Sequence, residues 1–348
     1  MDFGKARFSG LILFSFLSAL TCSGGQISDP SGPGLFLSGK AVYDWHDEAR
    51  DRALPTTIWY PARPDGTADR SHAPYPLILF SHGSGGSRDN YTYLTAHLAT
   101  HGFVVAACDH QGNVNLVQFA PAEPYMAVKR PQDISFVLDR LLDSAKGGDQ
   151  LLSGLIDPEK VGAAGHSFGG YTTMALAGAA LQLNEFRQMC QGPNPTTGCG
   201  FLDFPAQVPE LADRRIRAGL TLAPGLNELW GENMHGAASV AVPIMIMGGT
   251  TDVLVPAEKL EVLFPALPPN PRFYVQAVGG GHNGFTDAGN FGGSLGSERM
   301  WEIVRTYAVA FFQVYLAGEK GYQKYLTTDS AAAFGGSPAD FEFFRDPE

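Results

Sequence analysis

Short apolar runs alternate along this chain with longer segments of helical character. The apolar runs occupy residues 76–80, 103–108, 161–165, 216–220, 242–247 and 272–278. Helical segments rich in Ala, Leu and other helix formers lie between or after them, before Gly102 and at residues 130–142, 171–183 and 297–316. Strands that alternate with helices are typical of a parallel sheet. We therefore expect an α/β fold with a mostly parallel central sheet and helices on both faces.

Weaker patterns predict the two ends of this core. Residues 41–60 read as an antiparallel pair at the sheet's edge, with a polar turn in 44–51. Residues 61–75, rich in Pro, Asp and Arg, are expected to be a surface linker. The predicted catalytic domain covers residues 36–318, and 319–348 are expected to be a weakly patterned C-terminal tail.

One serine stands between two glycines where a predicted strand meets a predicted helix. In Gly165-His166-Ser167-Phe168-Gly169, the strand ends just before the serine and the helix begins after it. Such a sharp turn lifts the serine hydroxyl clear of the backbone, and glycines let the strand and helix approach closely. The context favours Ser167 as a catalytic nucleophile over a helix-capping serine in a glycine-rich turn.

A nucleophilic serine needs a base and a group that orients the base. Asp252 follows the predicted strand 242–247, and His282 lies in a glycine-rich loop after the strand 272–278. Because the carboxyl ends of parallel strands meet at one edge of a sheet, we expect Ser167, Asp252 and His282 to lie together there. Glu228, in the loop after the preceding strand, remains an alternative acid.

The catalytic base has other candidates among nine histidines. His110 follows a predicted strand and could face the same site, although a structural role in its loop is the simpler interpretation. His166 lies within the elbow and cannot turn back toward its neighbour Ser167. His282 is favoured by its position.

Acyl transfer also needs donors for the oxygen that becomes negative in the tetrahedral intermediate. The backbone amide of Phe168, directly after the serine, is one expected donor. The loop Ser81-His82-Gly83-Ser84-Gly85-Gly86 follows the strand 76–80, and we assign the second donor to the amide of Ser84. The loop lacks the Gly-Lys-Ser/Thr ending of a phosphate-binding loop, so a nucleotide site is disfavoured.

These motifs resemble the platelet-activating factor acetylhydrolase and dienelactone-hydrolase-like branch of the α/β-hydrolases. The resemblance covers roughly residues 36–318 and rests on 81–83, 98–107, 130–142, 165–170 and the loop of His282 and Phe285. It implies an α/β-hydrolase fold and hydrolysis of carboxylic esters by Ser167 and His282 with the two oxyanion amides. The acid does not carry over, because Ala223-Pro224 stand where the acetylhydrolases have it. Dienelactone hydrolases proper use cysteine where this chain has Ser167.

Residues 184–214 form an insertion rich in Pro, Gly and Phe between the elbow helix and the next strand. In this fold such a segment commonly covers the site, so it is a candidate lid, with a decorative surface loop as the equal alternative. The candidate wall residues are Phe186, Phe201 and Phe204. Cys190 and Cys199 bracket a turn-rich loop that a disulfide could close.

The N-terminal sequence predicts that the protein is exported. Lys5 and Arg7 precede an apolar stretch, Phe8 to Leu20, that is too short for a membrane span and fits a signal peptide, which we place at residues 1–22. Cys22 stands where a lipoprotein would be cut and acylated, so an outer-membrane lipid anchor and release as a secreted or periplasmic protein both remain open.

The composition of the chain disfavours some classes of function. The chain has 348 residues, 44% hydrophobic, and a formal net charge of −11. This charge argues against a nucleic-acid partner. No metal-ligand spacing appears, so we expect no cofactor and no metal. The expected protein is a monomeric serine hydrolase of small or lipid-like esters with short to medium acyl chains. An acyltransferase or peptidase using the same residues, and a catalytically dormant binding module, are the alternatives.

Overall fold

The computed structural model describes residues 27–114, 123–193, 195, 197–200, 203–335 and 339–345. The predicted signal peptide 1–22, with Cys22, lies outside the described residues, as does Phe201 of the insertion.

The described chain is built around a nine-stranded sheet in the order β1-β2-β4-β3-β5-β6-β7-β8-β9. The strands are β1 (Leu37–Asp47), β2 (Arg52–Ala62), β3 (Tyr75–Ser81), β4 (Val104–Cys108), β5 (Ile156–His166), β6 (Ile216–Leu222), β7 (Ile244–Gly249), β8 (Arg272–Ala277) and β9 (Phe341–Arg345). The pairs from β4 through β8 are parallel, whereas β1–β2, β2–β4 and β8–β9 are antiparallel. The mostly parallel sheet and its antiparallel N-terminal edge are as predicted.

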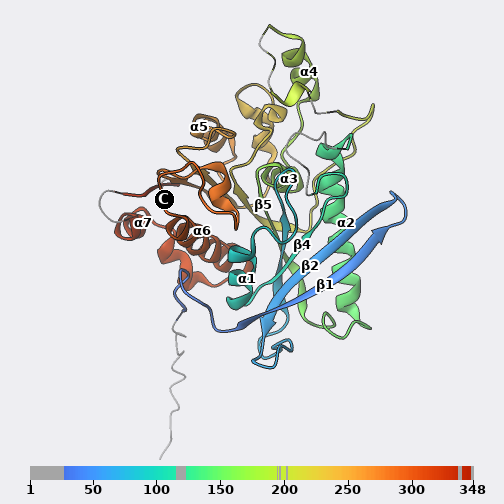
Figure 1. The fold of residues 1–348 in the computed structure, drawn as a ribbon, viewed down its shortest axis with the longest axis vertical. Coiled ribbons are helices and arrows are strands. Elements are labelled where there is room, and N and C mark those ends of the chain that lie inside the picture. The colour runs from blue at the N-terminus through green and yellow to red at the C-terminus, as the bar shows by residue number, and fades with distance from the viewer. Residues whose placement is uncertain are drawn as a thin grey trace, which may run out of the picture.

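Helices cover both faces of this sheet. They are α1 (Thr92–Thr100), α2 (Met126–Lys146), α3 (Phe168–Leu176), α4 (Leu183–Gln191), α5 (Ala257–Ala266), α6 (Ser297–Phe312) and α7 (Thr328–Gly335). Helix α1 packs against α6, and α2 packs against α3. Figure 1 shows α1 and α6 on one side of the strands and α2 on the other. No helix within the described ranges is long and apolar enough to cross a membrane.

The apolar run 76–80 forms most of strand β3, which is buried on both faces of the sheet. Ile78 and Phe80 point into one hydrophobic cluster, which includes Leu98 of α1. Leu77 and Leu79 point into the other cluster, which includes residues of α2. A strand buried on both faces needs apolar side chains at every position rather than at alternate ones.

Two helices differ in length from the sequence prediction. The elbow helix begins at Phe168 and ends at Leu176, instead of covering 171–183. It ends early because the chain turns at Gly178, whose φ of 106° suits glycine and ends a helix. The closing helix keeps its α-helical form only to Phe312, and Gln313–Ala317 form a π-helical turn.

Residues beyond the predicted domain limits 36 and 318 also pack against the core. Residues 341–345, expected to lie in a weakly patterned tail, form β9 and pair with β8. The aromatic ring of Phe343 stacks on Tyr307 of α6 at 5.3 Å. At the other end, the Ser28 hydroxyl lies 2.9 Å from the Tyr322 hydroxyl. Both extensions depend on partners distant in sequence, which a local pattern does not reveal.

Candidate active site

The turn that carries Ser167 is a strained strand-to-helix elbow. Ser167 has a φ of 54° and a ψ of −116°, a conformation that residues other than glycine rarely adopt. Its backbone is fixed on both sides, since its N–H donates to Leu222 O at 2.8 Å and its carbonyl accepts from Gly225 N at 3.0 Å. A Cβ on Gly169 would collide with the Ser81 carbonyl oxygen, so the glycine permits the close approach. The structure therefore has the geometry of a nucleophile elbow.

The structure brings Asp252 and His282 together at the carboxyl edge of the sheet. His282 begins a short 3₁₀ turn, His282–Phe285, and its Nδ1 lies 2.7 Å from Asp252 Oδ2. The carboxylate is buried, and its other oxygen accepts hydrogen bonds from the amides of Leu254 and Val255 at 2.9 and 2.8 Å. Because an ionised carboxylate only accepts, Nδ1 carries the proton and the Nε2 lone pair is left for another donor.

Glu228, the alternative acid, faces elsewhere. It lies in the 3₁₀ turn Asn227–Trp230, and its carboxylate is 3.8 Å from Lys259 Nζ. Within the described residues Glu228 makes no hydrogen bond or ion pair with His282, so the geometry favours Asp252 as the group that orients the histidine.

Ser167 and His282 line one cavity of about 380 Å³. Ser84 and the glycines of its loop line the same cavity, which connects the predicted oxyanion loop to the predicted nucleophile. Neither the Ser84 amide nor the Phe168 amide donates a hydrogen bond within the described part of the chain, whereas the Gly83 amide is occupied by Tyr91. The two amides chosen from the sequence are thus free to serve an oxyanion.

A second Ser-His-Asp arrangement lies beneath this cavity. His110 Nε2 is 2.9 Å from Ser81 Oγ, and His110 Nδ1 is 3.0 Å from Asp133 Oδ2. All three side chains are buried and none lines the Ser167 cavity. Burial lowers the pKa of His110, so the ring is neutral, with Nδ1–H donating to Asp133 and Nε2 accepting from Ser81. We interpret this arrangement as structural, since no substrate reaches Ser81.

Arg130 joins this buried cluster to the oxyanion loop. Its guanidinium donates to the His82 carbonyl and to Asn113 Oδ1 (2.6 Å), and Asn113 in turn donates to Ser84 Oγ at 3.1 Å. The Arg130 guanidinium also lies over the Phe168 ring, 4.7 Å from the ring centroid. Burial lowers the pKa of Arg130 to about 10, which still leaves it charged at neutral pH. Arg130 thus holds both segments that carry the candidate oxyanion amides.

Asp133 anchors the same cluster from one turn further along α2. Burial alone would raise its pKa, but hydrogen bonds from His110 and Arg52 outweigh burial and hold the pKa at about 2. In the sequence, residues 130–142 stand out only through the family resemblance. One local feature could have indicated this cluster. Arg130 and Asp133 carry opposite charges and lie three residues apart, on the same side of an amphipathic helix.

The described part of the insertion does not cover the site. None of its described residues lines the Ser167 cavity. Phe186 is buried in the main core and lies 6.1 Å from the Phe204 ring. A separate cavity of about 720 Å³ is lined by residues within 178–187, which lead from the elbow helix into the insertion, and by residues within 206–212 near its other end. The lid role of 184–214 therefore stays a prediction without support from these contacts.

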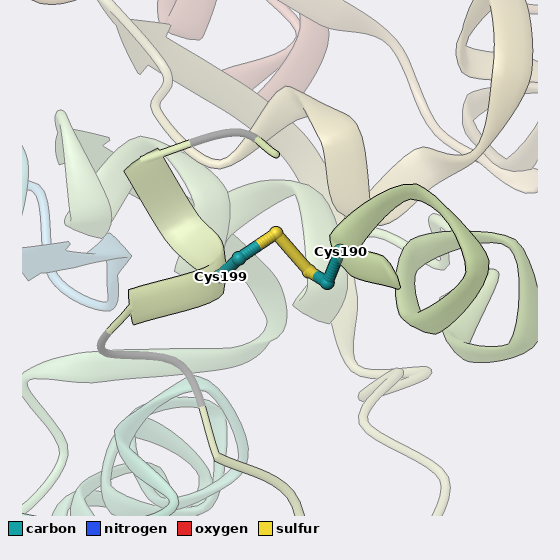
Figure 2. The surroundings of a disulfide bond; sticks show 2 residues. All are labelled: Cys190 and Cys199. Atoms are coloured by element: carbon teal, nitrogen blue, oxygen red, sulfur yellow. A yellow bond between two sulfur atoms is a disulfide. The ribbon is translucent and has the colours of Figure 1, made fainter. Parts of the chain in front are cut away.

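The predicted disulfide is present in the structure. Cys190 at the end of α4 is bonded to Cys199, with Cα atoms 5.4 Å apart (Figure 2). The remaining described cysteine, Cys108, is a buried free thiol.

Removing this disulfide is expected to reduce stability but not the reactivity of Ser167. For the double variant Cys190→Ser/Cys199→Ser, closing a loop of this length corresponds to about 2–3 kcal/mol of unfolding free energy. Because neither cysteine lines the Ser167 cavity, we expect the rate at which a fluorophosphonate labels Ser167 to change less than about twofold. Urea unfolding and labelling rates on the same samples check both. A large change in the labelling rate with the folded state intact would instead support the lid.

Among the described residues, no group of three or more His, Cys, Asp or Glu side chains is placed so that it could hold a metal ion. The groups that line the cavity include the Ser167 hydroxyl, the imidazole of His282 held by Asp252, and backbone amides of the Ser84 loop.

Comparison with known proteins gives one family match and several distant relatives. The family described as platelet-activating factor acetylhydrolase, isoform II, matches residues 56–137. This stretch contains the Ser84 loop and ends before Ser167. The platelet-activating factor acetylhydrolase of Cavia porcellus is 25% identical over 298 residues, which cover 72% of this chain and 60% of that protein.

Two further relatives extend the comparison. The acetylhydrolase of Canis lupus familiaris is 31% identical over 143 residues, covering 30% of this chain and 32% of that protein. Cutinase 2 of Thermobifida cellulosilytica is 23% identical over 273 residues, covering 78% of this chain and 76% of the cutinase. The matches thus span less than two thirds of the acetylhydrolases themselves. With the fold described above, they show that the chain belongs to the α/β-hydrolase superfamily, where it is a distant homologue of two groups of esterases, the platelet-activating factor acetylhydrolases and the cutinases.

Proposed function

We propose that this chain is a serine hydrolase that cleaves carboxylic esters of short to medium acyl length through an acyl-enzyme on Ser167. The observation that carries the proposal is that His282, held by Asp252 at 2.7 Å, lines the same cavity as the strained Ser167 elbow. Homology to acetylhydrolases and cutinases supports the ester chemistry.

In the proposed reaction Ser167 Oγ attacks the ester carbonyl carbon while its proton passes to His282 Nε2. Asp252 holds Nδ1–H and stabilises the imidazolium that forms. The amides of Ser84 and Phe168 donate to the carbonyl oxygen as it becomes negative. When the intermediate collapses, the ester oxygen leaves with the proton from His282, and a water activated by the same histidine then frees the acid.

The size of the cavity supports the proposal of small acyl groups. Its lining combines glycines and polar side chains with a few apolar groups, and its volume of about 380 Å³ is near the lower limit of ordinary ligand pockets. Its aliphatic lining is confined, among the described residues, to Leu254 and Ala288. A long alkyl chain would gain little apolar burial there.

The test is a series of p-nitrophenyl esters from acetate to palmitate, combined with labelling by a fluorophosphonate and mass spectrometry of the peptides. We expect kcat/KM to be highest for the short esters and the label to be attached to Ser167. A chain with no activity on any ester and no label would be a binding module. Acyl transfer to an added alcohol or amine at rates above hydrolysis would indicate an acyltransferase, and cleavage of a peptide substrate would indicate a peptidase.

We further propose that the protein is exported. The charged and apolar N-terminal segment and the Cys190–Cys199 disulfide support an oxidising compartment. The mass of the mature N-terminal peptide distinguishes the two routes, because acylation of Cys22 adds lipid to that residue whereas simple cleavage adds nothing. An N-terminal peptide that begins at Met1 in the extracellular or membrane fraction contradicts the signal peptide.

A further inference from the structure

A buried chain of hydrogen bonds connects the three loops that meet at Ser167. The Gly83 amide donates to the Tyr91 hydroxyl at 2.9 Å. The Tyr91 hydroxyl lies 3.0 Å from His166 Nδ1, and His166 Nε2 lies 3.1 Å from the His282 carbonyl oxygen. Both linking side chains are nearly inaccessible, with 1% of Tyr91 and 3% of His166 exposed. This series of hydrogen bonds thus runs from the Ser84 loop, through the elbow, to the loop of His282.

Each hydrogen bond in this chain has one possible direction. The His282 carbonyl can only accept, so His166 Nε2 carries the proton. Burial, and secondarily the nearby His282 ring, lowers the pKa of His166 well below its usual value, so the ring is neutral and Nδ1 has a lone pair. The Tyr91 hydroxyl, whose pKa burial raises, therefore donates to Nδ1 and accepts from the Gly83 amide. Every polar atom of the two side chains is used, which defines a single arrangement.

Ring packing reinforces the same connection. The His166 ring lies 4.6 Å from the His282 ring and 5.8 Å from the Phe285 ring. The Tyr91 ring lies 4.6 Å from Phe80 of β3. The two side chains are therefore packed between the core of the sheet and the His282 loop.

We propose that Tyr91 and His166 are positioning residues that set the His282 loop and the Ser84 loop relative to Ser167. Tyr91 occupies the Gly83 amide, so that the next amide, that of Ser84, is the one left free at the cavity. His166 holds the backbone of His282 while Asp252 holds its ring, so that the imidazole is fixed at both ends. This inference rests on the proposed function, because it assigns the two residues a role in that reaction.

The test compares Tyr91→Phe with Tyr171→Phe. Both tyrosines are buried, and each loses one hydroxyl and keeps its ring. The Tyr171 hydroxyl donates to the Ala127 carbonyl at 3.0 Å and takes no part in the chain of Gly83, His166 and His282. Misplacement of reacting groups by about 1 Å costs on the order of a hundredfold in rate. We expect Tyr91→Phe to lower kcat about 10- to 100-fold with KM within twofold, and Tyr171→Phe to leave both within about twofold.

A transition-state analogue separates positioning from general loss of structure. Affinity for a trifluoromethyl ketone, which forms a tetrahedral adduct on the serine, should fall in Tyr91→Phe by the same factor as kcat. Equal losses of kcat in both variants, in step with lowered thermal stability, would show a merely structural hydroxyl. Unchanged kcat in a folded Tyr91→Phe would overturn the proposal.

The tautomer of His166 gives a measurement that does not depend on ester hydrolysis. In the wild-type protein ¹⁵N NMR should show His166 as the neutral Nε2–H form with Nδ1 accepting a hydrogen bond, and Tyr91→Phe should remove the shift caused by that bond. If the wild type hydrolyses no ester, the proposed function fails and the catalytic role falls with it. A His166 found as Nδ1–H overturns the connection itself, whatever the activity.

Discussion

Replacing Ser167 by alanine is expected to lower kcat for ester hydrolysis by about a millionfold, to the level left by binding and oxyanion stabilisation alone. The reason is that the reaction loses its covalent intermediate, and neither His282 nor the two free amides can replace the nucleophile. KM should change little, because the hydroxyl contributes small binding energy to the ground state. Initial rates on p-nitrophenyl acetate, with active-site titration of the wild type, measure the loss.

Ser81→Ala is the matched control for this variant, because Ser81 belongs to the other Ser-His-Asp arrangement. Removing its hydroxyl leaves His110 Nε2 without a donor and should cost about 1–3 kcal/mol of unfolding free energy. The fluorophosphonate should still label Ser167 in Ser81→Ala, since Ser81 is 2% exposed and lies outside the cavity. Loss of labelling in folded Ser81→Ala, with labelling retained in Ser167→Ala, would reverse the assignment of the two serines.

Local sequence predicts those parts of the candidate site that depend on neighbouring residues. The elbow was visible because its two glycines flank the serine, and the structure shows the collision that a side chain at Gly169 would cause. Asp252 and His282 were visible because each directly follows a strand, and parallel strands deliver their ends to one edge. The Ser84 loop was visible from its glycines. In each case a few adjacent residues carry the signal.

The connections between these parts were not visible. Arg130 reaches His82 across 48 positions of the chain, and Tyr91 reaches His166 across 75. Nothing next to Tyr91 in the sequence distinguishes it from an ordinary core tyrosine, because its hydrogen-bond partners Gly83 and His166 come from other parts of the chain. The strand β9 is a similar case, since its pairing with β8 depends on Phe341 and Phe343 meeting α6. Such long-range contacts override weak local preferences.

Asp252→Asn is expected to lower kcat by about ten thousandfold with KM nearly unchanged. The asparagine oxygen can still accept the amides of Leu254 and Val255, so its NH₂ group is turned toward His282 Nδ1. An NH₂ donor there favours the tautomer with the proton on Nε2, which can no longer accept the proton of Ser167. The fold is preserved while the base is disabled. Initial rates and thermal unfolding of the same preparation separate these two effects.

Glu228→Gln supplies the comparison that decides between the two candidate acids. The Glu228 carboxylate faces Lys259, whose side chain is about half exposed. Neutralising Glu228 therefore removes an ion pair that contributes little free energy, and it leaves the contacts of His282 unchanged. We expect kcat within about twofold of the wild type. If Glu228→Gln lost activity and Asp252→Asn kept it, the acid would have to reach His282 from the loop after β6, in a conformation different from the one described here. The 2.7 Å separation of His282 and Asp252 predicts the opposite result.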